Sequence, residues 1–231
     1  MTTVMKDIKV YFDEISFQFV FKDTPEIVPE DLLKRKAENH GFEIEKGERI
    51  FRSPVGEIIV LNIGRKGGID LLYDPRESFI GIGTKTGDIS ILRNHVENTL
   101  LKIIRDLELQ DTAKFYRVIA RGKAWYGEDT KVILKNVVKV EQLNKIEDTI
   151  RSNIGLNVRL QPMTLRLIPA DKNFKELPWI DVVIEPLAAN PKYYYYSLAY
   201  MDSDYNRSIQ LLENLKDLSS QLIMIIGGEQ K

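Results

Sequence analysis

Cysteine is absent from this chain, and histidine occurs only twice, at His40 and His95. Disulfide bonds, thiolate nucleophiles and cysteine metal ligands are therefore excluded, and so is a zinc site built from three histidines. The longest apolar run, Leu222–Ile226, is far shorter than the roughly 20 residues needed to cross a bilayer. We therefore expect a cytoplasmic protein that does not insert into a membrane and needs no cofactor.

Charge of either sign is not in excess, because 33 basic residues face 34 acidic ones and the net charge is −1. Such a balance provides no overall attraction to nucleic acid or to an anionic membrane. The hydrophobic fraction of 43% is enough for a substantial core. A chain of this length forms one large domain or two domains of roughly 110 residues.

Two stretches of the chain, 70–107 and 181–218, follow the same pattern. Each begins with an acidic and apolar strand, DLLYDP or DVVIEP, and continues with a second strand and a long helix. Identical residues recur 111 positions apart at Asp70 and Asp181, Pro75 and Pro186, Leu100 and Leu211, and Asp106 and Asp217. Self-similarity at a fixed offset is typical of a repeat. We interpret the chain as an internal duplication with halves at 1–112 and 113–231.

Apolar periodicity predicts the same order of elements in both halves. In the first half we expect a strand at 15–21, a helix at 29–39, and a long helix that begins at the N-cap Asp88. Four strands are expected between these helices, at Phe42–Phe51, Glu57–Arg65, Gly68–Tyr73 and Ser78–Thr84. In the second half the expected elements are strands Phe115–Tyr126 and Lys131–Val140, helix Glu141–Asn153, strands Leu156–Leu160, Met163–Pro169, Ile180–Pro186 and Tyr193–Met201, and helix Ser203–Leu218.

Apart from the extra strand Lys131–Val140, which forms a hairpin with Phe115–Tyr126, each half is interpreted as β-α-β4-α. The chain is predicted to be an α+β protein whose antiparallel sheet carries its helices on one face, with both halves packed as one pseudo-two-fold unit. This order is similar to the repeat of the TATA-box-binding protein, a saddle of two such halves, and the resemblance covers most of the chain. That protein kinks DNA with paired phenylalanines, whereas Phe17, Phe19 and Phe21 alternate here like core residues. The resemblance implies an architecture and no functional residues.

A basic and aromatic stretch at 114–139 is the strongest candidate for nucleic-acid binding. Lysine and arginine neutralise phosphates, and aromatic rings stack on bases. The residues predicted to make these contacts are Arg117, Arg121, Lys123, Trp125 and, further along the chain, Arg159. Odd-numbered residues of one strand share a face, so the first three are expected on one surface. A solvated sheet edge protected by lysines explains the same pattern.

Tyrosines cluster in the strand predicted at 193–201. The candidates for a ligand or partner surface are Tyr193, Tyr195, Tyr196 and Tyr200, because tyrosine combines an apolar ring with a hydroxyl group. Alternate side chains of a strand point to opposite faces, so one set is expected in the core. Ordinary cross-strand packing is the alternative interpretation.

Two short motifs resemble ion sites. The loop GIGTKTGD at 81–88, with Lys85, precedes a helix whose N–H groups are able to hold phosphate, but a plain strand-to-helix turn is the favoured interpretation. Oxygen-bearing side chains occupy four calcium-loop positions, at Asp202, Asp204, Asn206 and Glu213. Arg207 stands where such a loop needs glycine, so an acidic helix N-cap is favoured and no metal site is predicted.

Acids that recur in both halves are candidates for acid–base chemistry, at Asp70, Asp74, Asp181 and Glu185. Acids at strand ends are usually turn formers or ion-pair partners, so no catalytic residue is predicted. We expect a non-catalytic binding module that uses an exposed sheet face or a groove between the halves to hold a protein partner or a second copy of itself. The alternatives are nucleic-acid binding through 114–139, and a small-molecule binder or enzyme with a pocket lined by tyrosines and carboxylates.

Overall fold

The structure is a computed structural model that describes residues 8–21, 28–53, 56–125, 144–145, 147–149, 151–152, 164–173, 176–187, 189–190 and 192–226. Its elements up to residue 112 are β1 (Lys9–Phe21), α1 (Glu30–Asn39), β2 (Glu43–Ser53), β3 (Gly56–Lys66), β4 (Ile69–Asp74), β5 (Phe79–Thr84), α2 (Ile89–His95), the π-helical turn η1 (Val96–Leu100), α3 (Leu101–Asp106) and the 3₁₀ turn η2 (Gln110–Thr112). They are followed by β6 (Ala113–Trp125), β7 (Leu165–Leu167), β8 (Trp179–Pro186), β9 (Tyr193–Asp202) and α6 (Tyr205–Ile226).

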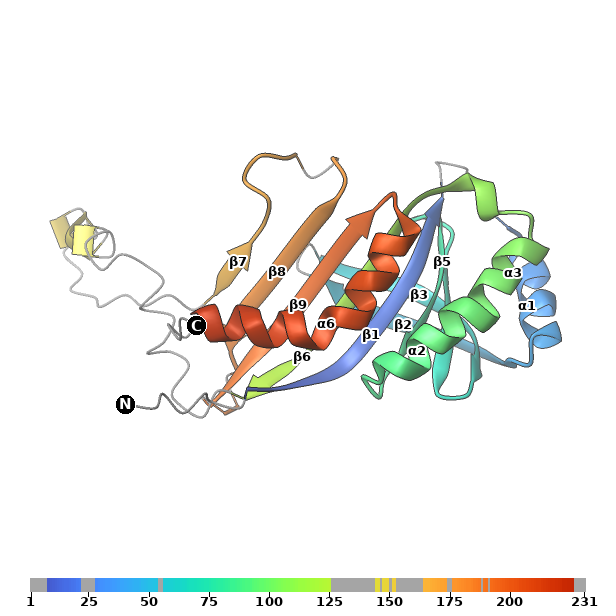
Figure 1. Cartoon of the computed structure of the whole chain (residues 1–231), viewed down its shortest axis with the longest axis horizontal. Coiled ribbons are helices and arrows are strands. Elements are labelled where there is room, and N and C mark those ends of the chain that lie inside the picture. Colours follow the sequence, from blue (N-terminus) through green and yellow to red (C-terminus); the bar gives the residue numbers. More distant parts are fainter. Residues whose placement is uncertain are drawn as a thin grey trace.

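The strands form one antiparallel sheet with the order β2-β3-β4-β5-β1-β6-β9-β8-β7. β1 and β6 lie side by side at its centre. Each of them pairs on its other edge with the strand that precedes a long helix, β5 or β9. The helices α2, α3 and α6 lie across one face of this sheet (Figure 1). The α+β class predicted from the sequence is confirmed.

The main core lies between these helices and the sheet, on what we call the helix face. Phe17 and Phe19 of β1 point to this face and are at most 2% exposed. Phe17 lies opposite Ile82 of β5 and Val118 of β6, which are also buried. Alternate residues such as Gln18 belong to the opposite side, which we call the far face. The alternation predicted for this strand therefore matches its position at the centre of the sheet.

The far face is partly covered by the sheet itself. Val20, Leu72 and Phe79 pack there in one cluster with Val60 of β3, and all four are at most 6% exposed. Figure 1 shows β2 and β3 running behind the central strands. Ordinary sheet twist brings distant strands around in this way. An accessible binding surface on the far face is therefore confined to the part that lies away from β3.

The first long helix begins at Asp88, as predicted. The Oδ1 atom of Asp88 accepts hydrogen bonds from the backbone N–H groups of Ser90 and Ile91, at 2.9 and 3.2 Å. These bonds satisfy donors that have no partner inside the helix. The helix then continues from α2 through the π-helical turn η1 into α3.

The second long helix, α6, ends at Ile226, and the prediction that it ends at Leu218 is wrong. The buried stripe continues beyond that point through Ser219, Ile223 and Ile226. Spacings of three and four residues keep these side chains on the same helix face. Burying an isoleucine side chain contributes roughly 1.5–3 kcal/mol, so the two isoleucines hold the last turns of the helix against the sheet.

Several predicted elements fall outside the described residues. These are the strands at 131–140 and 156–160, while of the helix expected at 141–153 only 144–145, 147–149 and 151–152 are described, and they are helical. The strand expected at Met163–Pro169 is present as the shorter β7. Within the described ranges, no helix is both long and apolar enough to cross a bilayer.

Candidate functional site

At one end of the far face, two neighbouring rows of side chains run across the central strands. In the first row, Lys123 of β6 lies between Tyr11 of β1 and Tyr195 of β9. In the second row, Trp125 of β6 lies opposite Tyr193 of β9. Side chains directly opposite each other in an antiparallel sheet have Cβ atoms about 5 Å apart. We call these five residues the aromatic patch.

The aromatic patch is accessible to solvent. The Tyr11 side chain is 46% exposed, and the other three rings are half-buried. The residues that follow or precede them in their strands, such as Phe12 and Tyr194, point to the helix face and are buried. The patch is thus the outward half of a strand alternation whose inward half belongs to the core.

The aromatic patch combines two residues predicted to bind nucleic acid with two of the predicted tyrosines. Sequence analysis missed Tyr11, because the strand was expected to begin only at Ile15. A β-bulge between Phe12 and Glu14 shifts the register of β1 against β6 and interrupts the regular alternation. The alternation of polar and apolar residues from 8 to 12 was the signal that could have extended the strand.

Tyr196 and Tyr200 lie on the helix face and do not belong to the aromatic patch. Tyr196 is fully buried, its ring centroid lies 6.4 Å from that of Phe12, and burial raises its pKa to about 12. Tyr200 donates a 2.5 Å hydrogen bond to Asp202, and burial together with this bond raises the pKa of Tyr200. The four tyrosines predicted as one surface therefore divide between two faces.

Asp202 is fully buried where β9 meets α6. Arg207 donates to both of its carboxylate oxygens, from Nε at 2.7 Å and from Nη2 at 2.8 Å. Burial alone would raise the pKa of Asp202, but hydrogen bonds from Arg207, Tyr200 and the backbone N–H of Asp204 together lower it to about 2. The carboxylate is therefore ionised and fully engaged within the protein.

The other residues of the calcium-loop pattern have separate roles. Asp204 precedes α6, and its Oδ1 accepts from the backbone N–H groups of Asn206 and Arg207 at 2.8 and 3.2 Å. Glu213 lies two turns along the helix and forms an ion pair with Arg93 of α2. In the part of the chain that the structure describes, no group of three or more histidine, cysteine, aspartate or glutamate side chains is placed to hold a metal ion. The geometry is that of an acidic helix start.

Arg117 is held inside a polar network on the far face. Its Nε donates to Oε1 of Gln18 at 2.6 Å, its Nη1 lies 3.3 Å from Oε2 of Glu77, and its guanidinium lies 5.1 Å from the centre of the Phe79 ring. The Arg117 side chain is 11% exposed. Burial lowers its pKa, and the charge of Glu77 acts in the opposite direction. This guanidinium is used for internal packing and is poorly placed for phosphate.

The other basic residues predicted for nucleic-acid binding differ in accessibility. Arg121 shares the face of Arg117, as expected from its odd position, but its side chain is 9% exposed and its Nη1 lies 3.5 Å from Glu14. The Lys123 side chain is 44% exposed and its Nζ lies 4.0 Å from Asp13. Arg159 lies outside the described residues.

The acids that recur in both halves form ion pairs and turns. Asp70 accepts from Nε of Arg65 at 2.9 Å, and Asp181 accepts from Nη2 of Arg166 at 2.7 Å. The hydrogen bond to the aspartate raises the pKa of each arginine. Asp74 Oδ1 accepts from backbone N–H groups of the turn that follows β4. Glu185 accepts a 3.2 Å hydrogen bond from the Thr164 hydroxyl.

The glycines of the loop at 81–88 serve close packing. Gly87 has φ +66°, and a Cβ atom there would lie 1.9 Å from the carbonyl oxygen of Phe12. A Cβ atom on Gly81 would lie 2.6 Å from the carbonyl oxygen of Phe17. The helix N–H groups that phosphate would need are already bonded to Asp88. These contacts fit a strand-to-helix turn.

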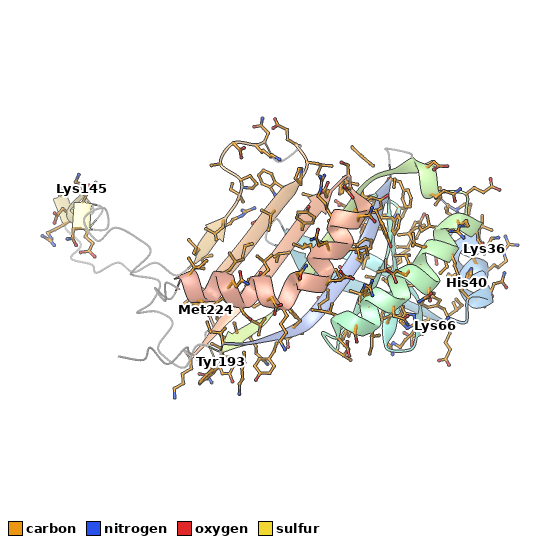
Figure 2. The ribbon with its side chains drawn as sticks, in the orientation of Figure 1. Lys36, His40, Lys66, Lys145, Tyr193 and Met224 are labelled. Carbon is orange, nitrogen blue, oxygen red and sulfur yellow. The ribbon has the colours of Figure 1, made fainter. Side chains whose placement is uncertain are left out.

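The two histidines lie in a separate region. His40 Nε2 and Asp106 Oδ2 are 2.9 Å apart, and this hydrogen bond is the main cause of the lowered pKa of Asp106. Lys66 donates to the His40 carbonyl. Figure 2 shows His40 and Lys66 together at the opposite end of the molecule from Tyr193. His95 Nδ1 lies 3.2 Å from the Thr99 hydroxyl.

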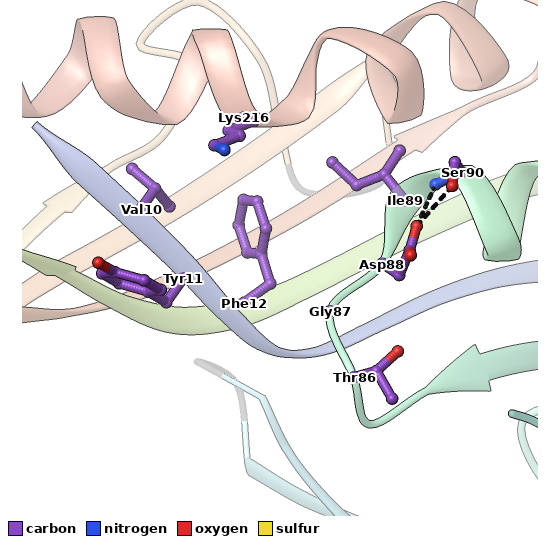
Figure 3. A pocket seen from close by; sticks show the side chains of 9 residues that line it. All are labelled: Val10, Tyr11, Phe12, Thr86, Gly87, Asp88, Ile89, Ser90 and Lys216. Atoms are coloured by element: carbon purple, nitrogen blue, oxygen red, sulfur yellow. Dashed lines mark hydrogen bonds between the residues drawn. The ribbon is translucent and has the colours of Figure 1, made fainter.

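A groove lies on the helix side of β1, where the loop between β5 and α2 faces α6 (Figure 3). Its volume is about 360 Å³. It is lined by Val10, Tyr11, Phe12, Thr86, Gly87, Asp88, Ile89, Ser90 and Lys216. The groove therefore lies between the two predicted halves of the chain.

Comparisons of this protein with models of protein families, with curated proteins and with solved structures find no match in any of the three. Function is therefore inferred from the geometry of the aromatic patch and the groove.

Proposed function

We propose that the protein is a non-catalytic binding protein that holds a protein partner on the aromatic patch. The supporting observation is that four aromatic rings from three adjacent strands share one accessible surface. Tyrosine and tryptophan are enriched among the residues that dominate the energy of protein interfaces. Their rings bury a large apolar area, while the O–H or N–H group is still able to form a hydrogen bond. A second copy of the chain is the partner to test first.

Nucleic acid is the second candidate, and Lys123 is the residue that favours it. This lysine lies between two tyrosines of the aromatic patch, which suits a phosphate beside stacked bases. Arg117 and Arg121 are buried against carboxylates and do not add to it. Asp13 lies 4.0 Å from Lys123 and offsets its charge. Lys9 lies opposite Trp125, and Glu185 lies opposite Tyr195. Two lysines and two carboxylates therefore balance around the patch, which favours a protein partner.

Sedimentation over a range of protein concentrations tests self-association. We expect the wild-type protein to dimerise reversibly, and the double variant Tyr11→Ala/Tyr195→Ala to dimerise at least about tenfold more weakly, because truncation of a central aromatic residue often costs more than 1.4 kcal/mol. Ile225→Ala is the control, since it removes a 69% exposed apolar side chain from α6. This control should dimerise as strongly as the wild-type protein.

Single-stranded oligonucleotides separate the two candidates. A wild-type protein that stays monomeric, binds an oligonucleotide and loses it as salt rises would support nucleic acid instead, because phosphate contacts weaken with salt. Dimerisation that is equally strong in the double variant would reject the aromatic patch as the interface. A protein that remains monomeric and binds no oligonucleotide would reject both the second-copy partner and nucleic acid.

We also propose that the chain is an internal duplication with an architecture similar to that of the TATA-box-binding protein. The strand order reads alike in both directions from the central β1–β6 pair, with β5, β4 and β3 on one side and β9, β8 and β7 on the other. In both directions an aspartate pairs with an arginine of the next strand, Asp70 with Arg65 and Asp181 with Arg166. The likeness concerns architecture, and no functional residue is transferred.

The long helices support the duplication with a different offset. Their N-terminal aspartates, Asp88 and Asp204, lie 116 positions apart (204 − 88), whereas the strand aspartates lie 111 apart. With the larger offset, buried positions coincide: Leu92, Val96, Thr99 and Ile103 with Ser208, Leu212, Leu215 and Ser219. The sequence match of Leu100 with Leu211 keeps the smaller offset and is out of this register, in which buried Leu100 coincides with exposed Lys216. An insertion of five residues between β8 and β9 accounts for the change.

A further inference from the structure

The groove on the helix face has an apolar centre and polar ends. Val10 and Phe12 of β1 line it on one side, and the Phe12 ring points toward α6 in Figure 3. Ile89 lies on the opposite wall, at the start of α2. Cavities of roughly 300–1,000 Å³ with an apolar lining and a few polar groups are typical sites for small molecules. The groove, at about 360 Å³, lies in this range.

The backbone around the groove is firmly positioned. Gly87 brings the loop against β1, so closely that a Cβ atom would lie 1.9 Å from the Phe12 carbonyl oxygen. The β-bulge between Phe12 and Glu14 lies at the same place in β1. Bulges redirect side chains and are frequent next to binding sites. The lining is therefore largely formed before any ligand arrives.

Charges of opposite sign occupy the two walls. Asp88 contributes a carboxylate whose pKa is lowered first by the Ser90 side chain and then by the backbone N–H of Ile91. The backbone N–H groups of Ser90 and Ile91 at the helix start are already bonded to this carboxylate. The loop wall of the groove therefore presents the negative charge of Asp88. Lys216 brings an ammonium group from α6 on the opposite wall. Among the described carboxylates, none forms an ion pair with Lys216.

We propose that this groove binds a small amphoteric molecule. Its apolar body lies on Phe12 and Ile89, its cationic group faces Asp88, and its anionic group faces Lys216. An apolar molecule without charges brings no oppositely charged group to either wall, and a molecule with one charge brings it to only one of them. Tyr11 lines the groove and also belongs to the aromatic patch. Phe12, Asp88 and Lys216, which carry this proposal, are not part of the patch, so this site does not depend on the function proposed above.

Nuclear magnetic resonance titration with ε-aminocaproate tests the site. We expect saturable shifts of the amide signals of Phe12 and Gly87, and binding on the order of tenfold tighter than that of caproate or hexylamine, each of which lacks one charge. Lys216→Met should weaken the binding of ε-aminocaproate to the affinity of hexylamine for the wild-type protein. Lys102→Met, an exposed lysine of α3, is the matched control and should change nothing.

Asp88→Asn tests the other wall without removing the helix cap, because asparagine is also a good N-cap residue. This variant should weaken the binding of ε-aminocaproate and leave the binding of caproate unchanged. The proposal is overturned if no probe gives saturable shifts, if all three bind equally, or if the shifts are the same in the Lys216 and Asp88 variants as in the wild-type protein. Thermal unfolding of each variant shows that a loss of binding does not reflect a loss of folding.

Discussion

Arg207 donates hydrogen bonds to both carboxylate oxygens of Asp202, across the turn that joins β9 to α6. The Asp202 side chain is fully buried, whereas that of Arg207 is 54% exposed. Tyr200 and the backbone N–H of Asp204 donate to the same carboxylate. This junction therefore depends on a buried charge that is stabilised from three directions, which makes it sensitive to substitution and to acid.

Replacing Asp202 should destabilise the fold. In Asp202→Asn the amide cannot accept from both Arg207 nitrogens, so a buried polar group loses partners, and we expect the free energy of unfolding to fall by about 2 kcal/mol. Chemical denaturation followed by circular dichroism measures the change. Asp111→Asn, an exposed position in η2, is the control. Equal stability of the two variants would show that the junction does not depend on this charge.

Acid should weaken the same junction. The pKa of Asp202 is about 2 in the folded protein and 3.8 is its ordinary value, so the folded state stabilises the ionised form. The resulting stability is complete above about pH 4 and is lost as pH falls toward 2. With allowance for the solvent around Arg207, about 1–2 kcal/mol should disappear in this range. The free energy of unfolding, measured at one temperature in steps from pH 5 to pH 2, should depend less on pH for Asp202→Asn than for the wild-type protein.

Asp70 and Asp181 provide a test of the proposed duplication. Both side chains are at most 5% exposed, and each pairs with an arginine that is about half exposed. Asp70→Asn and Asp181→Asn should therefore lower the melting temperature by similar amounts, and the double variant should show additive losses, because the pairs share no partner. A large effect at one position and none at the other would show that the two pairs are not structurally equivalent.

Local patterns were enough to predict much of the fold. The acidic cap at Asp88, the buried alternation of Phe17 and Phe19, and the order of the strands follow from spacings of two and of three to four residues. The predicted end of α6 at Leu218 lies before two serines, Ser219 and Ser220, although the apolar run Leu222–Ile226 continues the helix beyond them. Helix ends are decided by tertiary packing as well as by propensity.

The candidate surface was harder to predict than the fold. The aromatic patch joins Tyr11, Lys123 and Tyr195, which are more than 70 positions apart in the sequence at the closest, and only the pairing of β1, β6 and β9 aligns them. Burial is equally non-local. Arg117 was expected in solvent, but Gln18 of the neighbouring strand and Glu77 from before β5 enclose its guanidinium.

Alanine substitutions at Gly87 and Gly68 distinguish the cost of backbone strain from the cost of steric overlap. Both have positive φ, +66° and +84°, but a Cβ atom on Gly68 meets nothing within 4 Å, whereas one on Gly87 would overlap the Phe12 carbonyl oxygen. Gly68→Ala should cost about 1 kcal/mol, the usual penalty of a left-handed backbone. Gly87→Ala should cost about 3 kcal/mol or more, because β1 must shift as well. Denaturant unfolding measures both, and equal costs would show that the loop at Gly87 relaxes freely.

His95 should make stability depend on pH near neutrality. Burial, followed by the charge of Lys66, lowers the pKa of His95 below its ordinary 6.5. The unfolded chain therefore takes up the proton first as pH falls, and stability decreases from about pH 6.5 downward. Nuclear magnetic resonance titration of a His40→Gln variant leaves one histidine signal to follow. We expect its pKa to lie below 6.5 and to rise when Lys66→Met is added, because a nearby positive charge is removed. A pKa at or above 6.5, or one unchanged by Lys66→Met, would contradict this account, and the stability of His95→Gln should vary less over the same pH range.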